Sequence, residues 1–166
     1  MLSQYDDSDG LPFVPPFDPP MPPQERVAAA ESIRARGNAL FKEGKTEGGL
    51  VAYEKALRYL DQHPASGAPP ALTCRVAALS NAAMCRLKLD DPRRAIELCD
   101  RVLKIEGHGK NAKALFRKGC AHRALGDYEK AVEALEEARV AAPDDAGVKA
   151  ELLRAEKDLK KFRFGW

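Results

Sequence analysis

The sequence lacks the short motifs by which enzymes and metal sites are usually recognised. No GxSxG elbow, phosphate-binding loop, HExxH helix or paired-carboxylate signature occurs in the 166 residues. The four cysteines form no CxxC pair, and His63, His108 and His122 lack the spacing of metal ligands. We therefore expect no enzyme activity, no cofactor and no metal, and we expect the cysteines to be reduced, packed thiols.

The sequence also lacks a strong charge of one sign and any long apolar run. Its net charge is +2, which gives no general attraction to nucleic acid or to anionic lipid. No stretch is apolar enough to span a bilayer, and the N-terminus lacks the basic-then-apolar order of a secretory signal. We expect a cytoplasmic protein with neither nucleic acid nor membrane among its partners.

Residues 1–24 differ in composition from the rest of the chain. They hold seven of the twelve prolines, four aspartates and no lysine or arginine. Because proline removes a backbone donor and blocks helix, we expect a flexible or polyproline-like arm. Two interpretations stay open: a flexible leader, or a segment that docks on its own domain or on a partner through apolar residues that include Phe13 and Phe17.

From Gln24 onward the apolar periodicity predicts helices and no sheet. Gly44, Gly107 and Gly126 are predicted to end helices, and Pro92 suits a first helical turn. A break is expected over residues 63–70. The predicted helices cover residues 26–43, 46–62, 71–89, 92–106, 110–125, 128–141 and 145–162.

The helices form pairs, and the pairs repeat with the small, turn and aromatic positions of the tetratricopeptide repeat (TPR). The first pair departs from the pattern at Gly48 and Gly49, where alanine is the better helix former. We predict an all-α fold: an α-solenoid of three repeats, near 30–63, 76–107 and 112–143, within a domain over 25–163, plus a capping helix over 145–162. The pattern rests on Gly37, Gly44, Tyr53 and Ala56 in the first pair, and on Gly119, Gly126, Tyr128, Ala131, Ala138 and Pro143 in the third.

Five polar residues are predicted to line the concave face, which the first helix of each pair forms. Arg34 and Asn38 are four residues apart and share a helix face, as do Lys113 and Arg117, with Asn81 on the helix between them. Three cations and two amides would make a cradle of hydrogen-bond donors. Such donors suit a ligand whose groups accept hydrogen bonds only, as carboxylates do.

Three segments resemble the two-carboxylate clamp of TPR co-chaperones of the immunophilin type. They are RARGNALFKEGK (34–45), LSNAAMCRLKL (79–89) and NAKALFRKGCAHRALGDYEKA (111–131), and the resemblance extends over about residues 26–163. It implies that Arg34, Asn38, Asn81, Lys113 and Arg117 bind the C-terminal EEVD peptide of cytosolic heat-shock chaperones. Arg34 stands where the family has lysine, which keeps the charge but changes the donor geometry.

Members of that family carry a prolyl-isomerase domain ahead of the repeats, and these 166 residues leave no room for one, so we expect no such activity. Two other interpretations of the concave face stay open: it binds a different acidic C-terminal peptide, or it is a solvated helix face without a ligand. A function of a different class also stays open: the chain would be a structural subunit of a large assembly, held by its convex face, its N-terminal arm and its C-terminal tail. The tail, residues 162–166, either packs on the last helix or docks a partner through Phe164 and Trp166.

Overall fold

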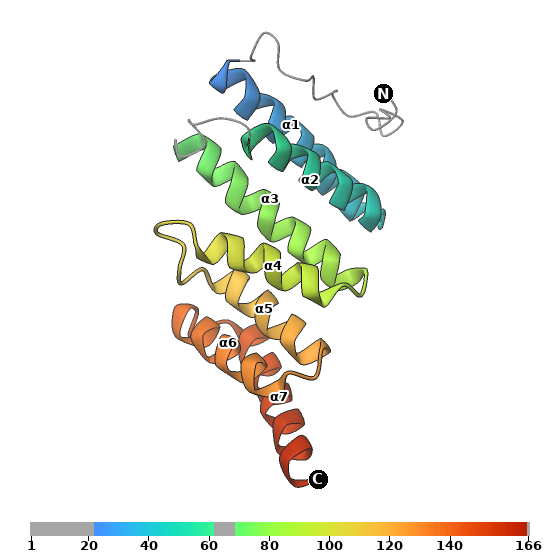
Figure 1. The fold of residues 1–166 in the computed structure, drawn as a ribbon. Coiled ribbons are helices and arrows are strands. Elements are labelled where there is room, and N and C mark those ends of the chain that lie inside the picture. The colour runs from blue at the N-terminus through green and yellow to red at the C-terminus, as the bar shows by residue number, and fades with distance from the viewer. Residues whose placement is uncertain (1–21, 62–68, 166) are drawn as a thin grey trace. The chain divides into compact units, whose positions relative to one another are not determined.

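The computed structural model describes residues 22–61 and 69–165, and within these ranges it contains helices and no strand (Figure 1). The all-α prediction is confirmed. The chain divides into two compact units, residues 1–85 and 86–166, so that the boundary falls inside α3. The helices are α1 (Pro23–Lys42), α2 (Thr46–Asp61), α3 (Pro69–Lys88), α4 (Pro92–Leu103), α5 (Ala112–Ala124), α6 (Tyr128–Ala141) and α7 (Ala146–Phe164).

Helix ends differ from the prediction by up to three residues, and two of the differences occur where prolines begin the helices. α1 starts at Pro23 rather than near residue 26, and α3 starts at Pro69 rather than at residue 71. Proline fits the first turn because its missing N–H is one that a helix leaves unpaired there. The end of the predicted arm, residues 23–24, is therefore helical. The rest of the arm, with Phe13 and Phe17, lies outside the described residues, as does most of the predicted break.

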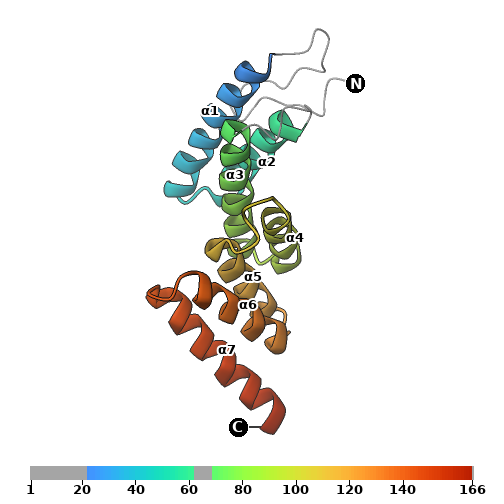
Figure 2. The same ribbon diagram turned by 90° about the vertical axis from the view of Figure 1, so that its left-hand side faces the viewer.

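In the first unit, α1 and α2 form an antiparallel hairpin whose helices lie side by side in both views (Figures 1 and 2). The turn between them contains Gly44, whose φ of +79° is a left-handed conformation that glycine adopts without strain. The amide of Lys45 donates to the carbonyl of Leu40 at 2.9 Å and closes the helix end. The hairpin and α3 share one buried apolar cluster: Ala30, Ile33, Ala52, Ala56, Tyr59, Leu60, Ala71 and Cys74.

Two glycines allow α1 and α2 to approach closely. A Cβ atom at Gly37 would lie 2.8 Å from Cε1 of Tyr53, and one at Gly49 would lie 3.2 Å from the carbonyl oxygen of Gly37. The close approach therefore explains Gly37 and Gly49, which both sit where the two backbones face each other. Nothing in the structure explains Gly48, because a Cβ there would meet Leu40 at an ordinary 3.4 Å.

In the second unit, α5 packs between α4 and α6, and α7 packs on α6. Asparagine and aspartate side chains cap the start of three of these helices. Asp91 accepts a hydrogen bond from the amide of Arg94 at 3.3 Å, Asn111 from that of Ala114 at 3.0 Å, and Asp145 from that of Val148 at 3.0 Å. Arg123 joins α5 to α7 through Asp158 and Glu151. Two buried apolar clusters of this unit contain Leu115, Ala131, Leu135, Ala138, Val148, Leu152 and Ala155.

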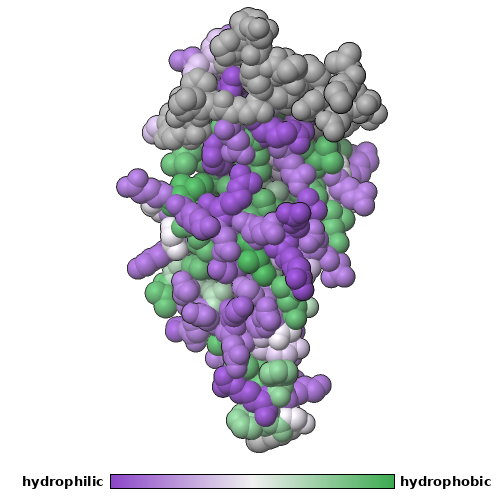
Figure 3. All heavy atoms as spheres, viewed as in Figure 1, coloured by the Kyte–Doolittle hydropathy of each residue, from purple (hydrophilic) through white to green (hydrophobic). Residues whose placement is uncertain are grey.

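The last turn of α7 contacts the first turn of α6. Arg163 pairs with Glu129 at 2.9 Å, and the rings of Phe162 and Tyr128 are 5.7 Å apart. Phe162 and Phe164 nevertheless stay 70% and 62% exposed, and this end of α7 shows hydrophobic surface in Figure 3. The predicted aromatic tail is thus helical as far as Phe164, and Trp166 lies outside the described residues. A docking role for the tail stays a prediction.

Within the described ranges, none of the helices combines the length and the apolarity that crossing a bilayer requires.

The close packing at Gly119 makes a testable prediction. A Cβ atom at this position would lie 2.5 Å from Cγ of Leu135 and 3.3 Å from the carbonyl oxygen of Ala131. We expect Gly119→Ala to lower the free energy of unfolding by about 1–3 kcal/mol, measured by chemical denaturation, because α5 and α6 must separate. Gly48→Ala is the control and is expected to be neutral or to stabilise by up to about 1 kcal/mol. Equal effects of the two changes would contradict this packing.

Candidate functional site

The side-chain amide of Asn38 is the centre of a hydrogen-bond network in the first unit. Its Oδ1 accepts from the hydroxyl of Tyr53 at 2.7 Å and from Nδ2 of Asn81 at 3.1 Å. Tyr53 is 2% exposed, whereas Asn38 and Asn81 are half-buried. Because the carbonyl oxygen already has two donors, the group that Asn38 can offer to a ligand is its NH2.

Arg34 lies one turn before Asn38 on α1 and is half-buried beside Cys74 of α3. Burial raises the pKa of the Cys74 thiol, and the nearby guanidinium of Arg34 offsets part of that rise. The Nε atom of Arg34 is buried and has no hydrogen-bond partner among the described residues. The structure thus brings Asn38 and Asn81 into contact and places Arg34 on the same helix as Asn38.

Lys113 and Arg117 lie one turn apart at the start of α5 in the second unit. Lys113 is exposed, and no ion pair to it occurs among the described residues; the half-buried Arg117 lies near Cys99 of α4. Burial raises the pKa of the Cys99 thiol to about 12, and Arg117 opposes this rise. A lysine in the first turn also opposes the helix dipole. The two side-chain charges and the positive end of the helix dipole together concentrate positive charge at the N-terminal end of α5.

Sequence reasoning missed the role of Tyr53. Its position was recognised as the aromatic site of the first repeat, but the pattern does not say where the hydroxyl points. The hydroxyl reaches Asn38 because Gly37, the residue before it, lets the ring lie against α1. The third polar group of the network, the Tyr53 hydroxyl, is thus supplied by α2, the second helix of the pair.

Comparison with known proteins supports the repeat architecture. Residues 74–142 match the family model described as "Tetratricopeptide repeat". The human "FK506-binding protein-like" protein is 40% identical over 129 residues, which are 77% of this chain and 35% of that protein. The chain thus spans about a third of the length of this curated relative, and the resemblance to the repeat part of immunophilin-type proteins is confirmed.

Two solved structures extend the comparison. The C-terminal TPR-containing domain of a Plasmodium falciparum protein described as FK506-binding superposes with a TM-score of 0.78 and 26% identity, covering 86% of this chain and 96% of that chain. The Caenorhabditis elegans myosin chaperone UNC-45, solved in complex with an Hsp90 peptide, superposes with a TM-score of 0.70 and 31% identity. That match covers 80% of this chain and 14% of UNC-45.

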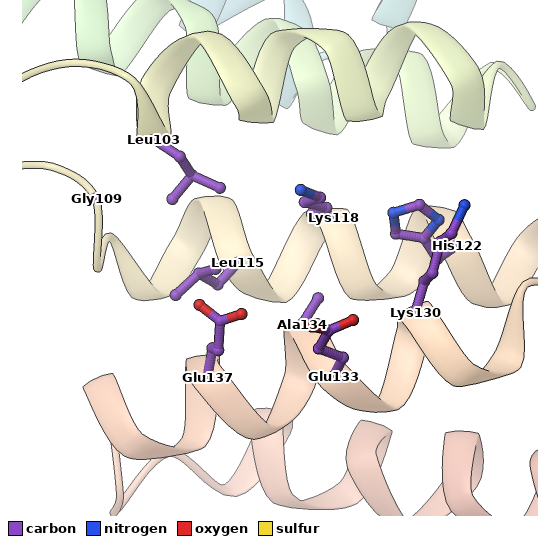
Figure 4. Close-up of a pocket in the computed structure, with 9 residues that line it drawn as sticks. All are labelled: Leu103, Gly109, Leu115, Lys118, His122, Lys130, Glu133, Ala134 and Glu137. Atoms are coloured by element: carbon purple, nitrogen blue, oxygen red, sulfur yellow. The ribbon is translucent and has the colours of Figure 1, made fainter.

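A separate cavity of about 250 Å³ lies in the second unit between the end of α4, α5 and α6 (Figure 4). Leu103 and Leu115 line one end, and His122 and Lys130 line the other. On α5 its residues Lys118 and His122 lie on roughly the opposite side of the helix from Lys113 and Arg117. Lys118 is already paired with Asp100 at 2.8 Å, and Glu133 and Glu137 add negative charge. The cavity therefore offers no excess of donors.

His122 in this cavity is 8% exposed, and its Nδ1 lies 3.5 Å from a carboxylate oxygen of Asp127. Burial lowers the pKa of His122; Asp127 opposes this, while Lys118 and Lys130 lower the pKa further. The imidazole is therefore held in its neutral form more strongly in the folded protein than in the unfolded chain.

This lowered pKa gives a pH-dependent prediction. As the pH falls below about 6.5, the unfolded chain takes up the His122 proton before the folded protein does, so the free energy of unfolding should fall. We expect the loss between about pH 7.5 and 5 to be smaller in His122→Gln than in the unmodified protein, measured by denaturant midpoints. An unaltered pH dependence in His122→Gln would contradict this assignment.

Proposed function

We propose that the chain is a protein-interaction module, a co-chaperone or adaptor that binds the C-terminal EEVD peptide of a cytosolic heat-shock chaperone. The proposed carboxylate clamp consists of Arg34, Asn38, Asn81, Lys113 and Arg117. The observation that carries the proposal is the amide of Asn38, whose oxygen is occupied by Tyr53 and Asn81 so that its NH2 is left for an acceptor. A carboxylate offers acceptors only and is the natural complement of such a group.

The charges of the second unit supply the other half of the proposed interaction. A peptide that ends in aspartate presents two carboxylates close together, and Lys113 and Arg117 carry two positive charges on one turn of α5. Like charges at this spacing slightly destabilise the helix, so a bound dianion would relieve their repulsion.

The relatives point to the same class of partner. UNC-45, with 31% identity over the matched region, was solved with an Hsp90 peptide, and the human relative is an FK506-binding-protein-like protein. We infer a ligand of the same chemistry here, and with it the cytoplasm as the compartment. Association and peptide ordering offset much of the energy of the charged hydrogen bonds, so we expect a dissociation constant in the micromolar range.

Calorimetry with a synthetic EEVD peptide tests this proposal. We expect Lys113→Glu and Arg117→Ala each to weaken binding by about tenfold or more, because each removes a charge-assisted hydrogen bond worth about 1.5–3 kcal/mol. Added salt should also weaken binding, because the groups that interact are charged. Lys149→Glu changes the net charge equally at an exposed position of α7 and should bind the peptide as the unmodified protein does.

The proposal fails if the peptide does not bind, or if Lys113→Glu and Lys149→Glu bind it equally well. The second candidate function, a structural subunit of a large assembly, predicts instead that the Lys113 and Arg117 variants change nothing. In that case, deletion of residues 1–22 or of the end of α7 would prevent incorporation into the assembly.

A further inference from the structure

We propose that Tyr53 is a positioning residue that makes the site prefer a free C-terminal carboxylate to a neutral C-terminus. This inference rests on the proposed function, because it concerns the same peptide. It adds Tyr53 of α2 to the site. The Tyr53 hydroxyl donates to Oδ1 of Asn38 at 2.7 Å and so acts on the peptide through Asn38.

The first step is the orientation of the Asn38 amide. A carbonyl oxygen has two lone pairs, and Oδ1 of Asn38 accepts from the Tyr53 hydroxyl at 2.7 Å and from Nδ2 of Asn81 at 3.1 Å. If the amide turned over, its NH2 would face the NH2 of Asn81, and two donors would meet. The two bonds therefore hold Asn38 in one orientation.

The second step is the position of the Tyr53 hydroxyl. The ring is 2% exposed and lies so close to α1 that a Cβ atom at Gly37 would be 2.8 Å from its Cε1. Since Gly37 directly precedes Asn38, the same close approach fixes the ring and the amide relative to each other. Asn81 is half-buried, so of the two donors to Asn38, Tyr53 is the more completely enclosed.

The consequence is selectivity between two kinds of C-terminus. A carboxylate can accept from the NH2 of Asn38, whereas a C-terminal carboxamide also carries an NH2 and can present a donor to a donor. Without the Tyr53 hydroxyl, Oδ1 of Asn38 keeps only the bond from Asn81, so the amide is held less firmly and turns more easily to receive a neutral terminus. The acid-to-amide affinity ratio therefore reports on Tyr53 directly.

The experiment compares two EEVD peptides, one with a free C-terminus and one with a C-terminal carboxamide, by calorimetry. We expect Tyr53→Phe to lower the acid-to-amide affinity ratio by about three- to tenfold, the range expected for one hydrogen bond. Tyr59→Phe is the matched control: it removes a hydroxyl from an equally buried tyrosine of α2, whose ring packs with Ile33 and Cys74. The acid-to-amide affinity ratio of the Tyr59→Phe variant should equal that of the unmodified protein.

The outcomes separate this inference from the proposed function. If the unmodified protein binds the acid peptide more tightly and Tyr53→Phe shows the same ratio, the positioning role of Tyr53 is overturned while the clamp stands. If the unmodified protein binds neither peptide, the proposed function fails. If Tyr53→Phe weakens both peptides equally, Tyr53 has only a structural role and the inference is again overturned.

A second measurement uses the unmodified protein and covers the case in which Tyr53→Phe does not fold. The Tyr53 hydroxyl proton, buried and bonded to Asn38, should exchange slowly enough with water to give a resonance with a cross-peak to Asn38. That resonance should shift on saturation with the acid peptide and shift less with the carboxamide peptide. Equal shifts with the two peptides, or a hydroxyl proton that shows no proximity to Asn38, would overturn the inference.

Discussion

The contact on which the proposed site depends is the close approach of α1 and α2 at Gly37. A side chain there would meet the Tyr53 ring at 2.8 Å, so glycine is the residue that lets Tyr53 lie against α1. From that position the Tyr53 hydroxyl reaches Asn38, and Asn38 in turn accepts from Asn81 of α3. The close packing of α1 and α2 thereby leaves the NH2 of Asn38, and not its carbonyl oxygen, as the group that Asn38 can offer to a ligand.

The second unit is built on the same principle but contributes charge rather than amides. Gly119 lets Leu135 approach α5, and Asn111 fixes the beginning of that helix two residues before Lys113. Lys113 and Arg117 are like charges one turn apart, and Lys113 also lies in the first turn of α5, where the helix dipole disfavours a cation. Residues that weaken their own helix are expected where binding, rather than folding, has selected them.

The sequence was sufficient to predict the helices, because their apolar residues recur with helical spacing over long stretches. It was also sufficient to propose the clamp, since spacings of four place Arg34 with Asn38 and Lys113 with Arg117, and the resemblance to TPR co-chaperones implies the full set of five residues. The hydrogen bond from Tyr53 to Asn38 could not be predicted, because it depends on how two helices pack. The start of α5 could have been predicted more closely, since asparagine at position 111 is a recognised helix cap.

The side-chain amide resonances of the three asparagines offer the most direct test of the central claim, which is that the NH2 of Asn38 donates to the peptide carboxylate. Asn111 serves as an internal reference, because its side chain caps α5. On titration with the acid EEVD peptide, we predict that the Asn38 NH2 protons move downfield to saturation while those of Asn111 stay in place. Saturable binding that leaves the Asn38 amide protons unmoved would contradict the account.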